Sequence, residues 1–143
     1  MIRAFQLICT SIMLQGCSFL VDLAFYNNTA SNIEVCNLNL EESVCQQING
    51  GTLAKVLLVG DKSAKSWRFS IESGGNVNFY DFEFGPYPTH ASDAYCEGFI
   101  QKRCDIPVQY EVNSLLYWGG KNKALPVRKF PAQPRGFPVE PNV

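Results

Sequence analysis

The sequence predicts an all-β fold, a small antiparallel β-sandwich of about seven or eight strands with two disulfide-stapled loops. Three observations lead to this prediction. Short segments alternate apolar and polar side chains with a period of two. Clusters of Gly, Asn and Ser separate these segments at intervals of about 8–15 residues. The 143 residues also include ten Phe, six Tyr and two Trp, which suit the half-buried surface of a pleated sheet.

The first two strands are predicted at residues 20–26 and 33–38. In residues 20–26, apolar side chains occupy every second position. Residues 27–32, Asn-Asn-Thr-Ala-Ser-Asn, have turn chemistry, because Asn tolerates left-handed backbone and hydrogen-bonds its own chain. The two strands are therefore expected to form a hairpin.

The next segments are less regular. Residues 40–47 are ambiguous, since Glu41-Glu42-Ser43 is compatible with the start of a short helical turn. Residues 52–59 are apolar apart from Thr52 and Lys55 and follow two glycines, which predicts a buried strand, although periodicity alone also allows a helix.

A central hairpin is predicted over residues 67–84. Trp67, Phe69 and Ile71 alternate with polar residues, and Ser73-Gly74-Gly75-Asn76 is a strong turn signal. The returning segment changes phase, because Val77 and Phe79 share one face whereas Tyr80, Phe82 and Phe84 share the other. Either both faces of that strand are buried or a bulge lies near Phe79 and Tyr80. This hairpin is expected to form the hydrophobic centre.

The remaining segments complete the sandwich. Residues 85–93 contain two prolines and leave the sheet, because proline cannot donate a ladder hydrogen bond. A strand is predicted at residues 108–112, continued or restarted at 115–118, with a hairpin turn at 119–123 and a return at 124–130. Residues 126–143 contain five prolines, which favours extended structure, with Phe130, Phe137 and Val139 able to hold the segment against the sandwich.

The N-terminal segment has the order of an export signal. Arg3 supplies a positive charge, and residues 4–14 are mostly apolar and too short to span a membrane as a helix. The run ends in Leu14-Gln15-Gly16-Cys17, which resembles the lipobox of bacterial lipoproteins. An ordinary secretory signal cleaved near Gly16 remains an alternative.

The resemblance covers only the first 17 residues, and it implies a lipid anchor. It implies removal of residues 1–16 and acylation of Cys17, which would attach palmitate-like chains and hold the protein on a membrane. Ser18 stands where inner-membrane lipoproteins often have Asp, so the resemblance favours the outer membrane, periplasmic face. The expected organisation is a signal at 1–16, a β-sandwich domain at 17–125 and a Pro-rich segment at 126–143.

The cysteines agree with export. The resemblance implies that Cys9 leaves with the signal and that Cys17 takes lipid, so an even number of the six cysteines remains for disulfides in an oxidising compartment. Four cysteines allow three connectivities. Cys36–Cys45 and Cys96–Cys104 are favoured, because each pair closes a short loop. Zinc ligands usually come as closer pairs, so no metal site is predicted.

The charge balance argues against nucleic acid as a partner. The chain has 12 basic and 13 acidic residues and no basic stripe. No cofactor-binding motif is present, since Ser73-Gly74-Gly75 and Trp118-Gly119-Gly120 do not match phosphate-binding loops.

No catalytic set stands out. The single histidine, His90, is followed by Ser92 and Asp93, but neighbours in sequence rarely converge as a triad. Asp81 and Glu83 would lie about 7 Å apart on one strand face, a pair that also fits a solvated surface. The sequence therefore predicts that the protein is not an enzyme.

The predicted function is that of a lipid-anchored envelope lipoprotein acting as a periplasmic binding module, with an immunity or inhibitor protein as a narrower hypothesis. Its expected partners are the membrane, through the acyl chains, and a periplasmic protein. A cell-wall-directed hydrolase or carbohydrate-binding module is the alternative.

The second stapled loop and its surroundings are the expected partner-binding region, because a stapled loop is preorganised and aromatic residues are common at interfaces. The residues of this region are Tyr87, His90, Tyr95, Phe99, Lys102 and Arg103.

Overall fold

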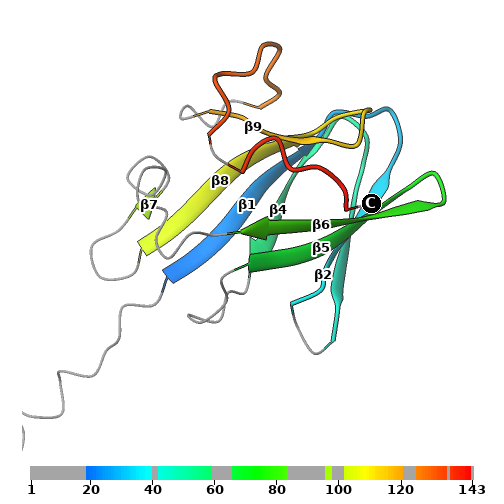
Figure 1. Cartoon of the computed structure of the whole chain (residues 1–143), viewed down its shortest axis with the longest axis horizontal. Coiled ribbons are helices and arrows are strands. Elements are labelled where there is room, and N and C mark those ends of the chain that lie inside the picture. Colours follow the sequence, from blue (N-terminus) through cyan, green and yellow to red (C-terminus); the bar gives the residue numbers. More distant parts are fainter. Residues whose placement is uncertain are drawn as a thin grey trace, which may run out of the picture.

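A computed structural model shows an all-β protein of two facing sheets (Figure 1). It describes residues 19–39, 42–58, 66–83, 96–97, 102–120, 125–134 and 136–142, with backbone alone for residues 19–21, 57, 58, 66, 83, 96, 97 and 102–104. Within these ranges, no helix has the length and apolar character that crossing a membrane requires.

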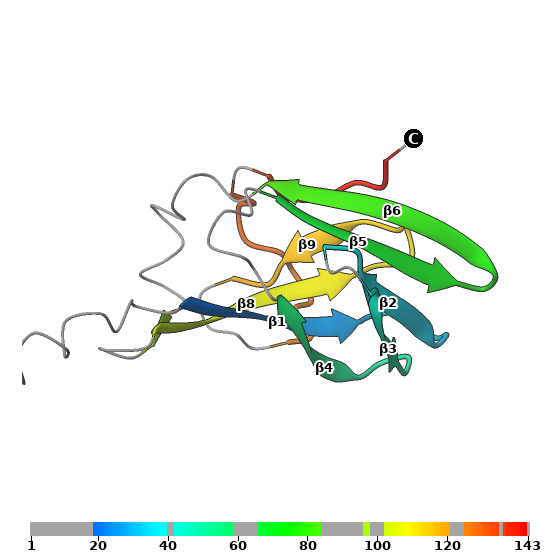
Figure 2. The same ribbon diagram turned by 90° about the horizontal axis from the view of Figure 1, so that it is seen from below.

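The described strands form two layers, which Figure 2 shows from a second direction. The first sheet has the order β4-β1-β8-β7, with β9 also paired to β8, and the second has the order β3-β2-β5-β6. The strands are β1 (Phe19–Asn27), β2 (Ile33–Asn37), β3 (Val44–Ile48), β4 (Leu53–Leu58), β5 (Ser66–Ser73), β6 (Asn76–Glu83), β7 (Cys96–Glu97), β8 (Lys102–Tyr110) and β9 (Leu116–Trp118). The predicted β-sandwich is therefore confirmed.

The predicted hairpin between the first two strands is wrong. β1 pairs antiparallel with β4 and parallel with β8, whereas β2 pairs with β3 and β5 in the other sheet. The turn after β1 thus carries the chain from one layer to the other. Turn chemistry sets where a strand ends but not which sheet the next strand joins. The crossing is favoured because it lets the apolar faces of β1 and β2 both be buried between the sheets.

The central hairpin β5–β6 is confirmed, with one correction to its faces. Gly74 and Gly75 both have positive φ, 59° and 81°, as a two-residue type I′ turn requires. The register runs without a bulge from Ser73 opposite Asn76 to Ser66 opposite Glu83. Tyr80 points into the core, while Val77 and Phe79 are 49% and 52% exposed. The apolar pattern of β6 therefore changes phase because Val77 and Phe79 are apolar although they lie on the outer, solvent-facing side of the strand.

Two further segments differ from the sequence prediction. Residues 44–48 form the edge strand β3, so Glu42 and Ser43 lead into a strand rather than a helical turn. β4 is a strand as predicted, but it is not buried on both faces. Val56 is buried against the core, whereas Leu53 faces outward and is 55% exposed. Successive side chains of a strand point to opposite faces of the sheet, and only one face of β4 meets the core.

Residues 125–130 do not return as a strand. Instead they lie beside the outward-facing side of β8. The Gln109 side chain accepts a hydrogen bond from Val127 N at 2.7 Å and donates to Val127 O at 3.1 Å. Gln109 is consequently fully buried although it faces away from the core. Val112, expected at the end of a strand, lies in the turn after β8 and is 80% exposed.

The C-terminal segment closes one side of the sandwich. Val139 exchanges backbone hydrogen bonds of 2.8 and 3.0 Å with Leu116 of β9. Phe137 packs on Phe82 of β6, and Asn142 N donates to Phe79 O at 2.7 Å. On the opposite side, the edges of β3 and β4 have no further strand partner among the described residues. The expected role of Phe137 and Val139 is thus confirmed.

The core lies between the sheets and receives side chains from both. Its centre is aromatic, because Phe69 stacks between Trp67 and Tyr80, with ring centroids 3.9 and 4.9 Å apart. The buried hydrophobic residues are Leu23, Phe25, Ile33, Val35, Ile48, Val56, Trp67, Phe69, Ile71, Tyr80, Val108, Tyr110, Leu116 and Val139. The predicted central hairpin supplies four of these and shares the core with the first sheet.

Candidate functional site

Four turns meet at the end of the sandwich that lies away from the start of β1. We call this region the turn end and define it as residues 27–34, 47–52, 71–78 and 110–116. The strand register brings its parts together, because Ile33 lies opposite Ser73 and Asn27 lies beside Tyr110. Figure 1 shows the β5–β6 turn at the opposite side of the molecule from the start of β1.

The turn between β1 and β2 is organised by the buried side chain of Asn27. Its Nδ2 donates to Ser31 O at 2.8 Å and to Ile48 O at 3.1 Å. Its Oδ1 accepts hydrogen bonds from the backbone N and the hydroxyl of Thr29, at 3.1 and 2.7 Å. With both ends of the amide satisfied, the turn is held in one conformation and its polar surface is preorganised.

The turn between β8 and β9 is held by a hydrogen bond from Tyr80 of the second sheet. Ser114 has a φ of 62°, a left-handed conformation that L residues with a side chain rarely adopt. The Tyr80 hydroxyl donates to Ser114 O at 2.9 Å, and Ser114 N donates to Glu111 O at 2.9 Å. Burial, together with the neighbouring Tyr110 hydroxyl, raises the pKa of Tyr80 well above its ordinary value. Tyr80 therefore stays a neutral donor across the ordinary pH range.

A half-buried carboxylate, that of Glu111 at the start of the β8–β9 turn, contacts the β1–β2 turn. Asn28 Nδ2 donates to both of its oxygens, at 2.9 and 3.0 Å. Gln109 Nε2 donates to Oε1 at 2.6 Å, and Gln109 is itself fixed by Val127. Among the described residues, no cation lies within ion-pair distance of Glu111. Its carboxylate is thus held by two neutral side-chain amides, those of Asn28 and Gln109.

The β1–β2, β5–β6 and β8–β9 turns line an open hollow of about 460 Å³. Amide, hydroxyl and carboxylate side chains make up most of the wall, and Val77 and Val112 add exposed apolar groups. Glu111 is the one charged residue among those found to line it. The wall is formed by Thr29, Ser73, Asn76, Val77, Asn78, Tyr110, Glu111, Val112 and Ser114. Its size lies within the range of about 300–1,000 Å³ common for small-ligand sites.

A second, smaller hollow of about 160 Å³ lies on the outer face of the second sheet. It is lined in part by Glu34 and Glu72, which are direct cross-strand neighbours on β2 and β5. Like charges placed opposite each other reduce sheet stability. The turn end contains these two glutamates and Glu111 but no Lys or Arg, so its formal charge is negative.

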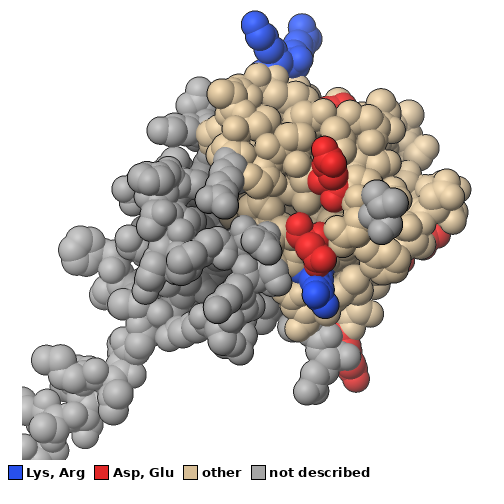
Figure 3. Space-filling view, in the orientation of Figure 1, with Lys and Arg blue, Asp and Glu red and all other residues tan. Residues whose placement is uncertain are grey.

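The face drawn in Figure 3 carries few charged groups. On the outer face of the second sheet, Arg68 Nε lies 3.1 Å from Asp81 Oδ1, and Asn142 Nδ2 donates to Asp81 Oδ2 at 3.1 Å. The candidate carboxylate Asp81 is therefore engaged in structural contacts. The side chain of Glu83 and the residues His90, Ser92 and Asp93 lie outside the described part.

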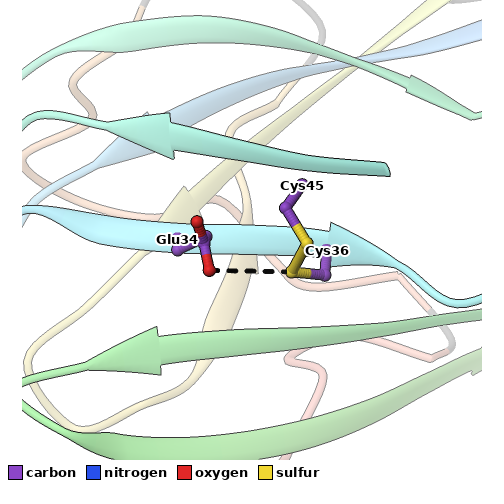
Figure 4. The surroundings of a disulfide bond; sticks show 3 residues. All are labelled: Glu34, Cys36 and Cys45. Carbon is purple, nitrogen blue, oxygen red and sulfur yellow. Dashed lines mark hydrogen bonds between the residues drawn. A yellow bond between two sulfur atoms is a disulfide. The ribbon is translucent and has the colours of Figure 1, made fainter. Parts of the chain in front are cut away.

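The predicted disulfide Cys36–Cys45 is confirmed (Figure 4). The two cysteines lie directly opposite each other on β2 and β3, with Cα atoms 4.0 Å apart. Glu34 Oε2 lies 4.0 Å from Cys36 Sγ, a contact only, because a disulfide sulfur carries no proton. These three residues could approach a metal ion together, but a disulfide removes both thiolates that metal binding needs.

Most of the predicted partner-binding residues lie outside the described residues, namely Tyr87, His90, Tyr95 and Phe99, as does the predicted lipidation site Cys17. The backbone of Lys102 and Arg103 starts β8 beside Phe19 and Leu20, at the end opposite the turn end. Cys104 lies opposite Cys96 in the β7–β8 register, as the predicted second disulfide requires, and that bond stays a prediction.

No local pattern in the sequence indicates the turn-end hollow. Turn chemistry indicates the Asn-rich turn and the Gly-Gly turn, but nothing near Glu111 in the sequence indicates its contacts, because one of its partners is distant along the chain. Asn28 is 83 residues away from it along the chain. The one signal in the sequence was the absence of Lys and Arg from four turn-rich segments.

Comparison with known proteins found no matching protein family, no matching curated protein and no matching solved structure.

Proposed function

We propose that the chain is a lipid-anchored lipoprotein of the bacterial envelope that acts as a non-catalytic binding module. The observation that carries the proposal is Leu14-Gln15-Gly16-Cys17, placed after a charged and then apolar segment. β1 begins at Phe19, two residues after Cys17, so almost no tether separates the proposed anchor from the domain. Ser18 favours the periplasmic face of the outer membrane.

The disulfide supports export to an oxidising compartment. Cys45 is exposed and Cys36 half-buried, so cellular reductants would have access to the bond. Disulfides are rare in the reducing cytosol and persist in the periplasm. The bond therefore agrees with the compartment that the N-terminal signal implies.

The geometry of the described part supports a binding role. Anchored next to β1, the domain would present the turn end away from the bilayer, where a partner can reach it. The turn-end hollow has walls fixed by Asn27, Tyr80 and Gln109, and a fixed surface loses little entropy on binding. An immunity or inhibitor protein that holds a periplasmic protein partner is the narrower form of this proposal.

Acylation of Cys17 tests the anchor. Cells producing the Cys17→Ser variant should make an unprocessed chain that takes up no labelled palmitate. Cys9→Ser is the matched control, because Cys9 lies in the same segment and should leave labelling unchanged. Normal labelling of the Cys17→Ser chain would refute the lipid anchor.

Carbohydrate binding is the second candidate, and the polar wall of the hollow favours it. Side-chain amides and hydroxyls such as those of Asn76, Asn78 and Ser73 are suitable partners for sugar hydroxyls. A cell-wall glycan fragment such as tri-N-acetylglucosamine should then bind at the turn end. No binding up to millimolar concentration would exclude this candidate.

A further inference from the structure

We propose that the far edge of β3, the side of this strand that faces away from β2, binds an extended segment of a protein partner that carries basic side chains. The segment would add to the second sheet as an antiparallel strand next to β3, a common mode of peptide recognition. This surface is separate from the turn-end hollow, so it goes beyond the proposed function by adding a second binding site and the chemistry of its ligand.

The backbone of β3 directs two of its residues toward the far edge. Leu38 N donates to Arg68 O at 2.9 Å, so the backbone groups of Leu38 point to β5. Alternate residues of a strand point the same way, so those of Cys36 also point to β5, and those of Cys45, directly opposite Cys36, point away from β2. Gln47 follows Cys45 by two residues and has the same direction. Their N–H and C=O groups are therefore oriented to pair with an added strand.

The far edge of β3 lacks the features that usually shield a sheet edge. Residues 44–48, Val-Cys-Gln-Gln-Ile, contain no charge, proline or glycine, and the first four of them are exposed. Two other edge strands differ, because β4 carries the exposed Lys55 and the Phe79 carbonyl of β6 accepts a hydrogen bond from Asn142. Among the described residues, no strand pairs with the far edge of β3.

The disulfide holds β3 ready for such pairing. β3 has five residues, and the bond joins directly opposite residues of β2 and β3, as Figure 4 shows. The register of this short strand against β2 is thereby fixed. A strand that is already ordered loses little conformational entropy when another strand is added to it.

The charges on the outer face of the second sheet favour a basic occupant. Gln47 lies opposite Glu34 of β2, and Glu34 lies opposite Glu72 of β5. All three line the smaller hollow of about 160 Å³. Arg68, a cation on the same face, is paired with Asp81 at 3.1 Å. A basic side chain placed beside Gln47 would therefore meet two glutamates, and an acidic one would be repelled.

The register also gives the side-chain pattern that fits. A residue paired with Cys45 or Gln47 has its side chain on the outer face, because directly opposite residues point to the same face. From the position beside Gln47, an arginine lies two strand spacings, about 10 Å, from Glu34, a span that extended Arg and Glu side chains bridge together. The residues between would lie on the core-facing side, next to Val44, which is 61% exposed. The segment that fits therefore alternates basic and apolar residues.

A second copy of this chain fits the far edge less well. Residues 31–54, which include β2 and β3, contain three glutamates and no Lys or Arg. Pairing β3 with β3 of a second copy would bring two acidic segments together, and like charges repel. It would also place no basic side chain beside Gln47.

The test uses the full chain and synthetic peptides of seven residues. Acetyl-Thr-Val-Arg-Val-Arg-Val-Thr amide should shift the NMR signals of the Cys45 and Gln47 amides and slow their hydrogen exchange, with a dissociation constant on the order of 0.1–1 mM. The same peptide N-methylated at both arginines keeps its charge but loses the N–H groups that would face β3, so it should bind at least about tenfold more weakly. N-methylation at two of the valines removes N–H groups that would point away from β3, and it should change the affinity less than about threefold.

Charge and position are tested separately. The peptide with citrulline in place of arginine is neutral and nearly isosteric, and it should bind at least about fivefold more weakly. Glu34→Gln should weaken binding of the arginine peptide several-fold, whereas Glu140→Gln, exposed in the C-terminal segment, should not. Gln47→Pro removes an outward N–H that β2 does not use, so it should abolish binding and keep the fold. If Gln47→Pro fails to fold, Gln47→Lys keeps the N–H and should still prevent binding by repelling arginine.

Protection of the Cys45 and Gln47 amides in the chain alone, equal to that of Gln46, would mean that the far edge is already paired and would overturn the proposal. Equal affinity of the two N-methylated peptides, or of the arginine and citrulline peptides, would also overturn it. So would dimerisation through β3 with no response to the arginine peptide. Palmitate labelling of Cys17 tests the proposed function separately, and its result leaves these outcomes unchanged.

Discussion

Tyr80 connects the two sheets at the turn end through a single hydroxyl. It lies on β6 of the second sheet and donates to Ser114 O in the β8–β9 turn of the first sheet. Only 1% of its surface is exposed, so ionisation would place a charge where water cannot reach it. The raised pKa of Tyr80 follows from that burial and, secondarily, from Tyr110.

Alkaline pH should therefore weaken the fold through Tyr80. The pKa is higher in the folded state than the ordinary value of about 10, so the unfolded chain loses its proton first. The contribution to stability is complete below about pH 10 and falls as pH rises toward the folded pKa. In urea denaturation between about pH 8 and 11, Tyr80→Phe should be about 1 kcal/mol less stable at pH 8 and should lose less stability on raising the pH. Equal pH slopes would contradict this account.

Ser114 holds a conformation that glycine adopts more easily. Its φ of 62° completes a short turn in which Glu111 N donates to Leu115 O. Ser114→Gly should stabilise the fold by about 0.5–1 kcal/mol, because glycine reaches left-handed backbone without steric cost. Thermal unfolding measures the change. Ser114→Ala is the control, since it removes the hydroxyl but keeps the strain, and it should give no stabilisation; an equal gain in both would contradict the explanation.

At the scale of elements, the sequence predicts those features whose determinants are local. The β5–β6 hairpin needs only alternation and two adjacent glycines, and the Cys36–Cys45 bond needs only two cysteines close in the chain. The parallel pairing of β1 with β8 was not predictable, because no turn connects these strands and their residues are about eighty positions apart. The hollow depends on the same long-range pairing, which places Asn28 next to Glu111.

The β2–β3 disulfide makes an element-level contribution to stability that can be measured. It closes a loop of sequence separation 9, which should contribute about 2–3 kcal/mol by the chain-entropy estimate. The double variant Cys36→Ser with Cys45→Ser should lose that amount in urea denaturation. Dithiothreitol should then destabilise the variant further only if Cys96 and Cys104 are also bonded. An unchanged midpoint in the double variant would contradict the expected contribution.

At the scale of the whole molecule, one side of the sandwich is closed by chain that is not a regular strand. The C-terminal segment bridges β9 of the first sheet and β6 of the second, through Val139 with Leu116 and through Asn142 with Phe79. It covers an edge that would otherwise offer unpaired backbone groups to another chain. The Pro-rich segment is thus part of the domain, although its composition resembles that of a linker.

Substitution at Val139 should therefore affect the whole fold. Val139 is 7% exposed and contributes both a backbone bridge and an apolar side chain to the core. Val139→Asp would bury a charge for which the described core residues provide no cation, so it should reduce the free energy of unfolding by more than about 3 kcal/mol. Glu140→Gln, exposed in the same segment, should change it by less than about 0.5 kcal/mol. Urea denaturation gives both values, and size-exclusion chromatography should show association of the Val139→Asp chain through the uncovered β6 edge. A Val139→Asp chain as stable as Glu140→Gln would mean that the segment rests on the sandwich without closing it.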